Sequence, residues 1–179
     1  MSRFREDPSA RTPSRFATGP NAYVTNDDVH ALQESAGHGP ARLNLHTGPD
    51  DDLHAMMILQ PAGNYAQPRL HRRRSKVFHI VRGELLVLTF DAAGELADIH
   101  ELRDGGTIAV LVTAGTFHTN VALTPQAVYH EVIAGPFDPS GDERLFADFA
   151  PDQSDQAQGL AWLAAAVAAR DPELARRMG

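Results

Sequence analysis

Cysteine is absent from the 179-residue sequence. Disulfides and thiolate metal sites are therefore excluded, and any metal ion would need histidine, carboxylate or water ligands. No apolar run approaches the roughly 20 residues that span a bilayer, and the N-terminal segment lacks the apolar centre of a secretory signal. These absences predict a cytoplasmic protein with no membrane partner.

Lysine is almost absent too, since Lys76 is the only one against fifteen arginines. Acidic residues are missing from one stretch, PRLHRRRSKVFHIVRG at 68–83, although the chain has a formal net charge of −7. That stretch gathers six basic residues around His71: Arg69, Arg72, Arg73, Arg74, Lys76 and Arg82. The acidic balance elsewhere argues against a nucleic-acid partner, which needs a broad basic face. A basic cluster inside an acidic chain needs a local explanation.

Short apolar runs broken by glycine and other turn residues fill the region from Arg42 to Phe149. Nine of them are predicted strands: 42–46, 55–60, 64–71, 77–83, 84–90, 96–103, 107–112, 119–123 and 127–134. Many short strands at this spacing are typical of an all-β sandwich or barrel.

The two ends of the chain have a different character. Residues 1–22 are predicted to be a disordered tail. A short helix then opens the main domain, 23–152, with Thr25 or Asn26 as N-cap and Gly37 as its stop. The last segment, 153–179, is Ala-rich and predicted to be helical, with Ser154 or Asp155 as its cap and a further turn beginning at 171–172. This C-terminal helix is expected to pack on the barrel or on a second subunit, so a homodimer is considered.

Strand alternation assigns faces within the basic stretch. Arg69 and His71 lie two residues apart and point to one side of their strand. On the next strand Lys76 shares a face with Phe78, and His79 lies on the opposite face. Arg69, His71 and Lys76 meet only if the turn between the strands folds one over the other. A bulge in that turn would instead aim His79 inward.

The spacing Gly63-x5-Arg69-x-His71-x4-Lys76-x6-Gly83 resembles the first cupin motif, G-x5-H-x-H-x4-E-x6-G. TAGTFHTN, which contains His118, resembles the second motif, P-x-G-x2-H-x3-N. Four blocks resemble WbuC-family cupins in the same order: LNLHTGPDD, FHIVRGELLVLTFDAAGEL, GTFHTNVAL and EVIAGPFDP. The resemblance covers about residues 42–151. It implies an all-β fold, the cupin double-stranded β-helix or jelly roll, with the ligand inside the barrel mouth.

The same resemblance implies a divalent metal (Fe, Mn, Ni or Zn) held by three histidines and a glutamate. Only His71 and His118 match that set, because Arg69 replaces one histidine and Lys76 replaces the glutamate. A guanidinium cannot ligate a cation, and two imidazoles are fewer than the three protein ligands of a usual catalytic zinc site. His79 is the candidate for a third ligand.

The first hypothesis is therefore that positive side chains occupy the space that the cation fills in relatives. Arg69 and Lys76, with His71 and His118, would bind a small anionic or sugar-derived ligand, and His46 would line the same pocket. Residues 72–74 would ring the mouth or form a solvated turn. The resemblance links such a protein to bacterial surface polysaccharide (lipopolysaccharide O-antigen) metabolism.

Two enzymatic alternatives remain open. One is a metal-dependent cupin enzyme that uses His71 and His118, with His79, His46 or water completing the metal shell. The other is a metal-free sugar-nucleotide isomerase or epimerase, in which His71 is the general base and Lys76 stabilises the developing enolate. The sequence does not decide whether the protein is an enzyme.

Overall fold

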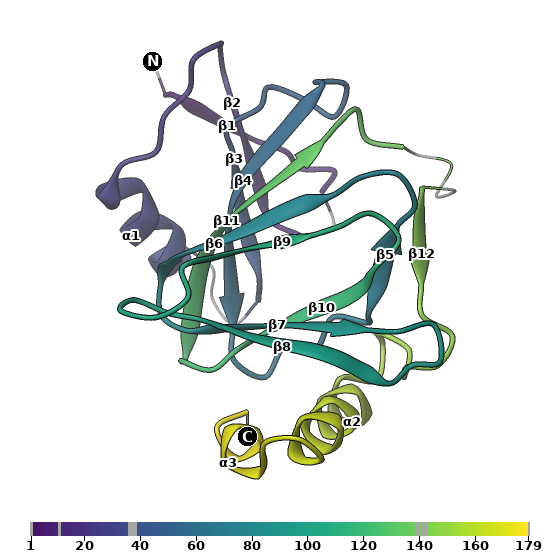
Figure 1. The fold of residues 1–179 in the computed structure, drawn as a ribbon. Coiled ribbons are helices and arrows are strands. Elements are labelled where there is room, and N and C mark those ends of the chain that lie inside the picture. Colours follow the sequence, from purple (N-terminus) through teal and green to yellow (C-terminus); the bar gives the residue numbers. More distant parts are fainter. Residues whose placement is uncertain (1, 11, 36–38, 139, 141–142, 179) are drawn as a thin grey trace.

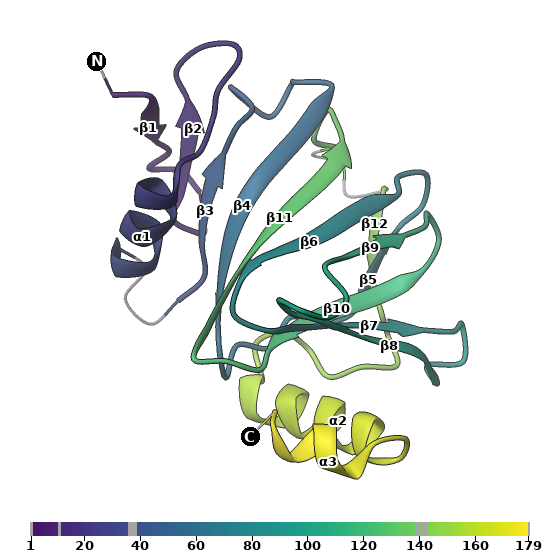
Figure 2. The ribbon, with the colours of Figure 1, turned by 60° about the vertical axis from the view of Figure 1, so that its left-hand side comes forward.

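A computed structural model describes residues 2–10, 12–35, 39–138, 140 and 143–178. Its strands form two sheets that face each other (Figures 1 and 2). The larger sheet has the order β1 (Phe4–Glu6), β2 (Ser14–Ala17), β3 (Ala41–Asn44), β4 (Leu53–Pro61), β11 (Gln126–Ala134), β6 (Lys76–Arg82) and β9 (Ala109–Val112). The smaller sheet has the order β12 (Arg144–Phe146), β5 (Arg69–His71), β10 (Phe117–Ala122), β7 (Leu85–Phe90) and β8 (Leu96–Leu102).

The order of the strands identifies the architecture. Four strands of the larger sheet, β4, β11, β6 and β9, face β5, β10, β7 and β8, and the named strand pairs within these two sets are antiparallel. The chain crosses repeatedly between the sheets, which is the double-stranded β-helix of cupins. The predicted all-β jelly roll is confirmed. All nine predicted strands are present, although the predicted strand 64–71 begins only at Arg69.

The space between the sheets holds an apolar core at one end. Its members include Ile58, Phe78, Val87, Val112 and Tyr129, which come from five different strands. β7 is buried at all six positions because its inner side chains enter this core and its outer ones are covered by a helix. The inner faces of β6 and β11 continue from this core into a group of polar residues, which β5 and β10 complete.

The C-terminal helices cover the outer face of the smaller sheet (Figures 1 and 2). α2 (Gln156–Ala168) begins after Asp155, whose side chain accepts a hydrogen bond from the Gln158 N–H. α3 (Pro172–Arg176) begins after Asp171. The cluster that joins them to the barrel includes Leu86, Leu88, Val121, Leu163 and Val167. The predicted helix thus packs on its own barrel.

The first helix, α1 (Asn26–Ser35), lies on the outer face of the larger sheet. The backbone N–H of Thr25 donates to the Asp28 carboxylate, and the Asp28 N–H donates to the Thr25 hydroxyl, which is a reciprocal cap. Thr25 is therefore the cap that the sequence predicted. Val29 and Leu32 pack against the sheet. The predicted stop at Gly37 lies outside the described residues.

The prediction of a disordered tail at 1–22 is wrong for its described part. β1 pairs with β2, and β2 continues the larger sheet by pairing parallel to β3. The segment is also tied to α1, because Arg3 forms an ion pair with Asp28 at 2.8 Å. The segment has few apolar residues, so its sequence gave little indication of strands. Backbone hydrogen bonds to the edge of β3 hold it in the sheet. The predicted domain boundaries at residues 22/23 and 152/153 stay predictions. None of the described helices is long and apolar enough to cross a membrane.

Candidate functional site

Polar side chains converge between the two sheets, beside the apolar core. We call them the interior polar cluster: Arg69, His71, Lys76, His118, Asn120, Tyr129 and Glu131. They come from β5, β6, β10 and β11. Lys76, His118, Asn120, Tyr129 and Glu131 are each at most 6% exposed. Four of the seven residues are sequence predictions.

The smaller sheet brings three members of the cluster together. Arg69 and His71 lie two residues apart on β5 and share its inner face. Arg69 is directly opposite His118 in the β5–β10 pair. The imidazole ring of His71 lies 6.3 Å from that of His118, between centroids. These three candidate pocket residues therefore lie close together on the smaller sheet.

The larger sheet contributes a buried ion pair. β6 alternates strictly, so Lys76 is 3% exposed on the inner face with Phe78. Its Nζ donates to Oε1 of Glu131 on β11 at 3.1 Å and lies 5.5 Å from the centroid of the Phe78 ring. Burial lowers the pKa of Lys76 to about 8, against the opposing charge of Glu131. Burial raises the pKa of Glu131, but the charges of Lys76 and Arg69 outweigh it and the net shift is downward.

The two histidines of the cluster are neutral at pH 7. Burial, followed by the charges of Lys76 and Arg69, lowers the pKa of His118 to about 3 and that of His71 to about 4. The ring nitrogen Nδ1 of His118 lies 2.9 Å from the backbone carbonyl oxygen of Thr116. A carbonyl only accepts, so Nδ1 carries the proton and Nε2 is left as a lone pair.

Unpaired polar atoms make the cluster a candidate binding site. Nε2 of His118, Nδ1 of His71 and Nδ2 of Asn120 are buried without a well-formed hydrogen bond to the described residues. The Asn120 amide approaches the Tyr129 hydroxyl, where it opposes the rise that burial causes in the pKa of Tyr129. Buried polar atoms are almost always paired in folded proteins, because leaving one unpaired costs roughly 1–3 kcal/mol. Three such atoms in one cluster indicate groups that a ligand would satisfy.

Arg69 is the cation that the protein leaves available. It is partly buried, and no hydrogen bond or ion pair from the described residues reaches its guanidinium. The neighbouring turn arginines are engaged elsewhere: Arg73 and Arg74 lie 3.2 Å and 3.7 Å from the buried carboxylate of Glu143. The turn is therefore anchored by Glu143, which the sequence analysis had not singled out.

The cluster does not fit the metal centre that the cupin resemblance implies. Its donors are two imidazoles, and the ammonium of Lys76 binds the only carboxylate of the cluster. Among the residues that the structure describes, no group of three histidine or acidic side chains is placed to hold a metal ion. A cation there would also face the charges of Lys76 and Arg69.

Two further predictions for the site are wrong or unsupported. His79 is exposed on the outer face of β6, so the proposal that it is a third metal ligand fails on strand alternation. His46 is buried, but its ring stacks on that of His54 at 4.3 Å and meets the edge of Phe16. No contact among the described residues joins His46 to the interior polar cluster.

Glu131, Asn120 and Tyr129 are the members that sequence reasoning missed. Alternation on β11 places Tyr129 and Glu131 on one face, and alternation on β10 does the same for His118 and Asn120. That signal was readable, but the pairing of β6 with β11 was not. Only this pairing sets Glu131 beside Lys76.

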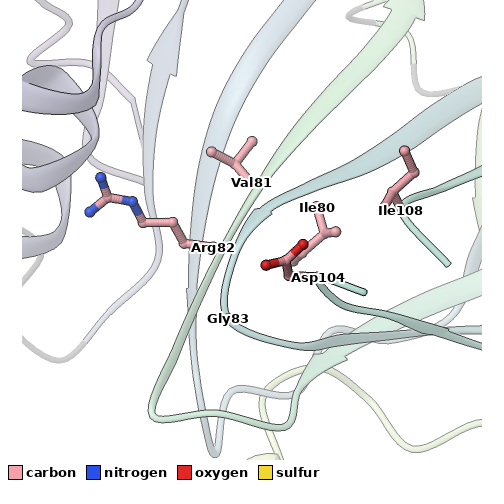
Figure 3. A pocket seen from close by; sticks show the side chains of 6 residues that line it. All are labelled: Ile80, Val81, Arg82, Gly83, Asp104 and Ile108. Atoms are coloured by element: carbon pink, nitrogen blue, oxygen red, sulfur yellow. The ribbon is translucent and has the colours of Figure 1, made fainter. Parts of the chain in front are cut away.

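A surface depression of about 330 Å³ lies at the opposite end of β6. It is lined by Ile80, Val81, Arg82, Gly83, Asp104 and Ile108. Figure 3 shows the Arg82 side chain directed toward α1 and away from Asp104. There it donates to Gln33 Oε1 at 3.2 Å. The depression includes no member of the interior polar cluster, and Asp104 is the one acidic residue among those that line it.

Comparison with known proteins supports the fold. The family model for a domain of unknown function, DUF6016, matches residues 24–102. No curated protein matches the sequence significantly. The structure of BH2720 from Bacillus halodurans has a TM-score of 0.51 and 23% identity, covering 68% of this chain and 87% of that one. This likeness shows the fold alone.

Two other solved structures are more distant in TM-score. KdgF from Halomonas sp. has a TM-score of 0.44 and 24% identity, covering 57% of this chain and 83% of that one. The capsular polysaccharide assembling protein CapF from Staphylococcus aureus has a TM-score of 0.49 and 18% identity, covering 62% of this chain. The chain spans about a third of CapF, 32% of its length.

Proposed function

We propose that the protein is a cupin-fold binding module that holds a small anionic or sugar-derived ligand in the interior polar cluster, without a metal ion. Arg69 supplies the charge that attracts the anion, and His71, His118 and Asn120 supply hydrogen-bonding groups. Lys76 acts indirectly: its ion pair with Glu131 holds the side chains at the base of the site in place. This role for Lys76 revises the direct anion contact expected from the sequence.

One observation carries the proposal. The Arg69 guanidinium is partly buried and makes no hydrogen bond or ion pair with the described residues, although its charge acts on Glu131. It lies opposite a histidine whose buried Nε2 is also unpaired. An arginine that only stabilised the fold would be expected to bond a carboxylate or carbonyl of the protein. A ligand anion fits its planar donor fork.

The biological setting follows from the sequence resemblance alone. The blocks shared with WbuC-family cupins support a role near bacterial surface polysaccharide metabolism, which is an associational argument. A cytoplasmic location and a homodimer remain predictions from the sequence.

The two enzymatic alternatives receive less support. A general base works best with a pKa near the working pH, and the pKa of His71 is lowered to about 4. Lys76, proposed to stabilise an enolate, already binds Glu131. Exchange of a sugar C–H hydrogen with deuterated solvent would nevertheless reveal an isomerase or epimerase.

The test is equilibrium binding of anionic sugars and nucleotide sugars, followed by isothermal calorimetry with wild type and Arg69→Gln. Removing a charge-assisted bidentate contact should weaken binding at least about tenfold, since such bonds contribute roughly 1.5–3 kcal/mol. Arg72→Gln is the matched control, because this exposed turn residue lies outside the cluster. Anion binding that is equal in all three proteins would contradict the proposal.

A further inference from the structure

Each unpaired atom of the cluster is either a hydrogen-bond donor or an acceptor, and this restricts the ligand further. The restriction rests on the proposed function. The Nδ1 of His118 donates to Thr116, so its Nε2 presents a lone pair to the site. A lone pair needs a hydrogen-bond donor from the ligand. A fully ionised carboxylate, sulfate or phosphate has only acceptors, and placing one there would repel rather than satisfy this nitrogen.

Asn120 has the complementary need. It is 3% exposed and lies two residues from His118 on the same face of β10. Its side chain approaches the Tyr129 hydroxyl, which can take only one of the two Nδ2 hydrogens, so at least one of them lacks a partner among the described residues. The amide NH2 group is a donor and needs an acceptor. A hydroxyl group is both a donor and an acceptor, so one hydroxyl, or two neighbouring ones, can serve the His118 lone pair and the Asn120 amide.

Arg69 completes the arrangement on the neighbouring strand. It is directly opposite His118, and residues so paired have Cβ atoms roughly 4.5–5.5 Å apart. Both side chains extend from there toward the space between the sheets, so a ligand whose negative group and hydroxyl are joined by a carbon chain suits the pair. Arg69 is also less buried than His118, which places the charged end of the ligand toward solvent.

We infer that the ligand class is a hydroxylated carboxylate: its hydroxyl donates to Nε2 of His118 and accepts from Nδ2 of Asn120, and its carboxylate binds Arg69. The site thereby distinguishes three kinds of molecule. Carboxylates without hydroxyls leave two buried polar atoms unpaired, and polyols without a carboxylate leave Arg69 unpaired. Fully ionised inorganic anions have no hydrogen to donate, so the lone pair on Nε2 of His118 repels them.

The experiment compares ligands of one chain length by calorimetry at pH 7: D-gluconate, hexanoate and sorbitol, with sulfate as the inorganic anion. Gluconate is expected to bind at least about tenfold more tightly than the other three, because an absent hydrogen bond to a buried group costs roughly 1.4 kcal/mol or more. His118→Phe, which keeps an aromatic ring, should abolish the preference of gluconate over hexanoate. Arg69→Gln should abolish the preference of gluconate over sorbitol.

A spectroscopic readout avoids dependence on variants that fold poorly. In protein labelled with 15N-histidine, the Nε2 signal of His118 should have the shift of an unprotonated nitrogen and move upfield on addition of gluconate but not of hexanoate. Hexanoate or sulfate binding as tightly as gluconate, through Arg69, would overturn the hydroxyl inference and leave the anion-binding proposal intact. Absence of Arg69-dependent binding for gluconate, hexanoate and sulfate would overturn both.

Discussion

The Nζ atom of Lys76 lies 3.1 Å from Oε1 of Glu131, with both side chains almost fully buried between the sheets. Lys76 stands at the motif position where the cupin resemblance expects a metal-binding glutamate. The inner face of β6 therefore carries an ammonium group instead of a carboxylate. The buried carboxylate comes from Glu131 on β11. The charge of this pair is balanced internally, which leaves Arg69 as the site's free cation among the described residues.

Replacing one partner of this pair should lower the free energy of unfolding more than replacing both. Lys76→Met leaves a buried carboxylate unpaired and Glu131→Gln leaves a buried ammonium unpaired, so each should lower the free energy of unfolding by roughly 3–5 kcal/mol. The double variant Lys76→Met/Glu131→Gln should lose much less than the sum. Urea unfolding of all four proteins measures the coupling.

The control for that cycle is the more exposed pair of Arg103 and Glu101, whose atoms lie 3.7 Å apart. Glu101 also binds Arg177 at 2.9 Å, and the cycle subtracts that loss because Glu101→Ala incurs it with and without Arg103. Exposed pairs contribute about 0–1 kcal/mol, so Arg103→Ala and Glu101→Ala should show little coupling. Additive losses at Lys76 and Glu131 would show that the buried pair contributes no coupling.

Stability should fall on acidification because of His118. Its folded pKa is lowered to about 3, against an ordinary value of 6.5, so only the unfolded chain takes up this proton as the pH falls from 6.5 toward 3. The free energy of unfolding should therefore decrease by up to about 1.4 kcal/mol per pH unit from this residue. His71 acts in the same direction down to about pH 4. Urea midpoints between pH 7 and pH 4 should show a shallower slope for His118→Asn; an unchanged slope contradicts the assignment.

Chelator should leave the melting temperature of the wild-type protein unchanged, and the purified protein should hold much less than one equivalent of metal. The double substitution Arg69→His/Lys76→Glu restores three imidazoles and a carboxylate, and the cation would offset the added charge beside Glu131. It should bind Ni2+ or Zn2+ and melt at a higher temperature when loaded. Adding His118→Ala should remove this gain. Stoichiometric metal in the wild type, with a lower melting temperature after stripping, would refute the metal-free assignment.

Gly159 in α2 should not tolerate alanine, although alanine is the better helix former by about 1 kcal/mol. A Cβ at this position would collide with the Tyr65 ring, which is fully buried and whose hydroxyl donates to the Pro151 carbonyl. Gly159→Ala should lower the melting temperature, whereas the exposed neighbour substitution Gln158→Ala should leave it nearly unchanged. A more stable Gly159→Ala protein would show that Tyr65 can move aside at little cost.

Local patterns were sufficient for much of the fold. Strict alternation on β6 predicted that Lys76 points inward and His79 outward, and two-residue spacing on β5 predicted the shared face of Arg69 and His71. The helix caps at Thr25 and Asp155 were also readable, since each requires only a few adjacent residues.

Long-range pairing was not readable in the same way. Glu131 meets Lys76 across 55 positions of sequence, and no local pattern specifies which strands become neighbours. β12 has only three residues, too few for a recognisable alternation. Its partner β5 also lies far away in the sequence. His46 differs from these residues: a motif block predicted a pocket role, which stays a prediction, and the ring contacts His54 and Phe16.

The N-terminal strands also change what the rest of the sheet presents to other molecules. A chain shortened to begin at residue 23 would leave β3 with a row of open backbone donors and acceptors, the template on which intermolecular sheets and aggregates grow. In the intact protein β2 occupies that row, and the outermost strand is β1, only three residues long and carrying Arg5 and Glu6. The segment predicted to be a disordered tail therefore covers a sheet edge that would otherwise be open to pairing with another chain.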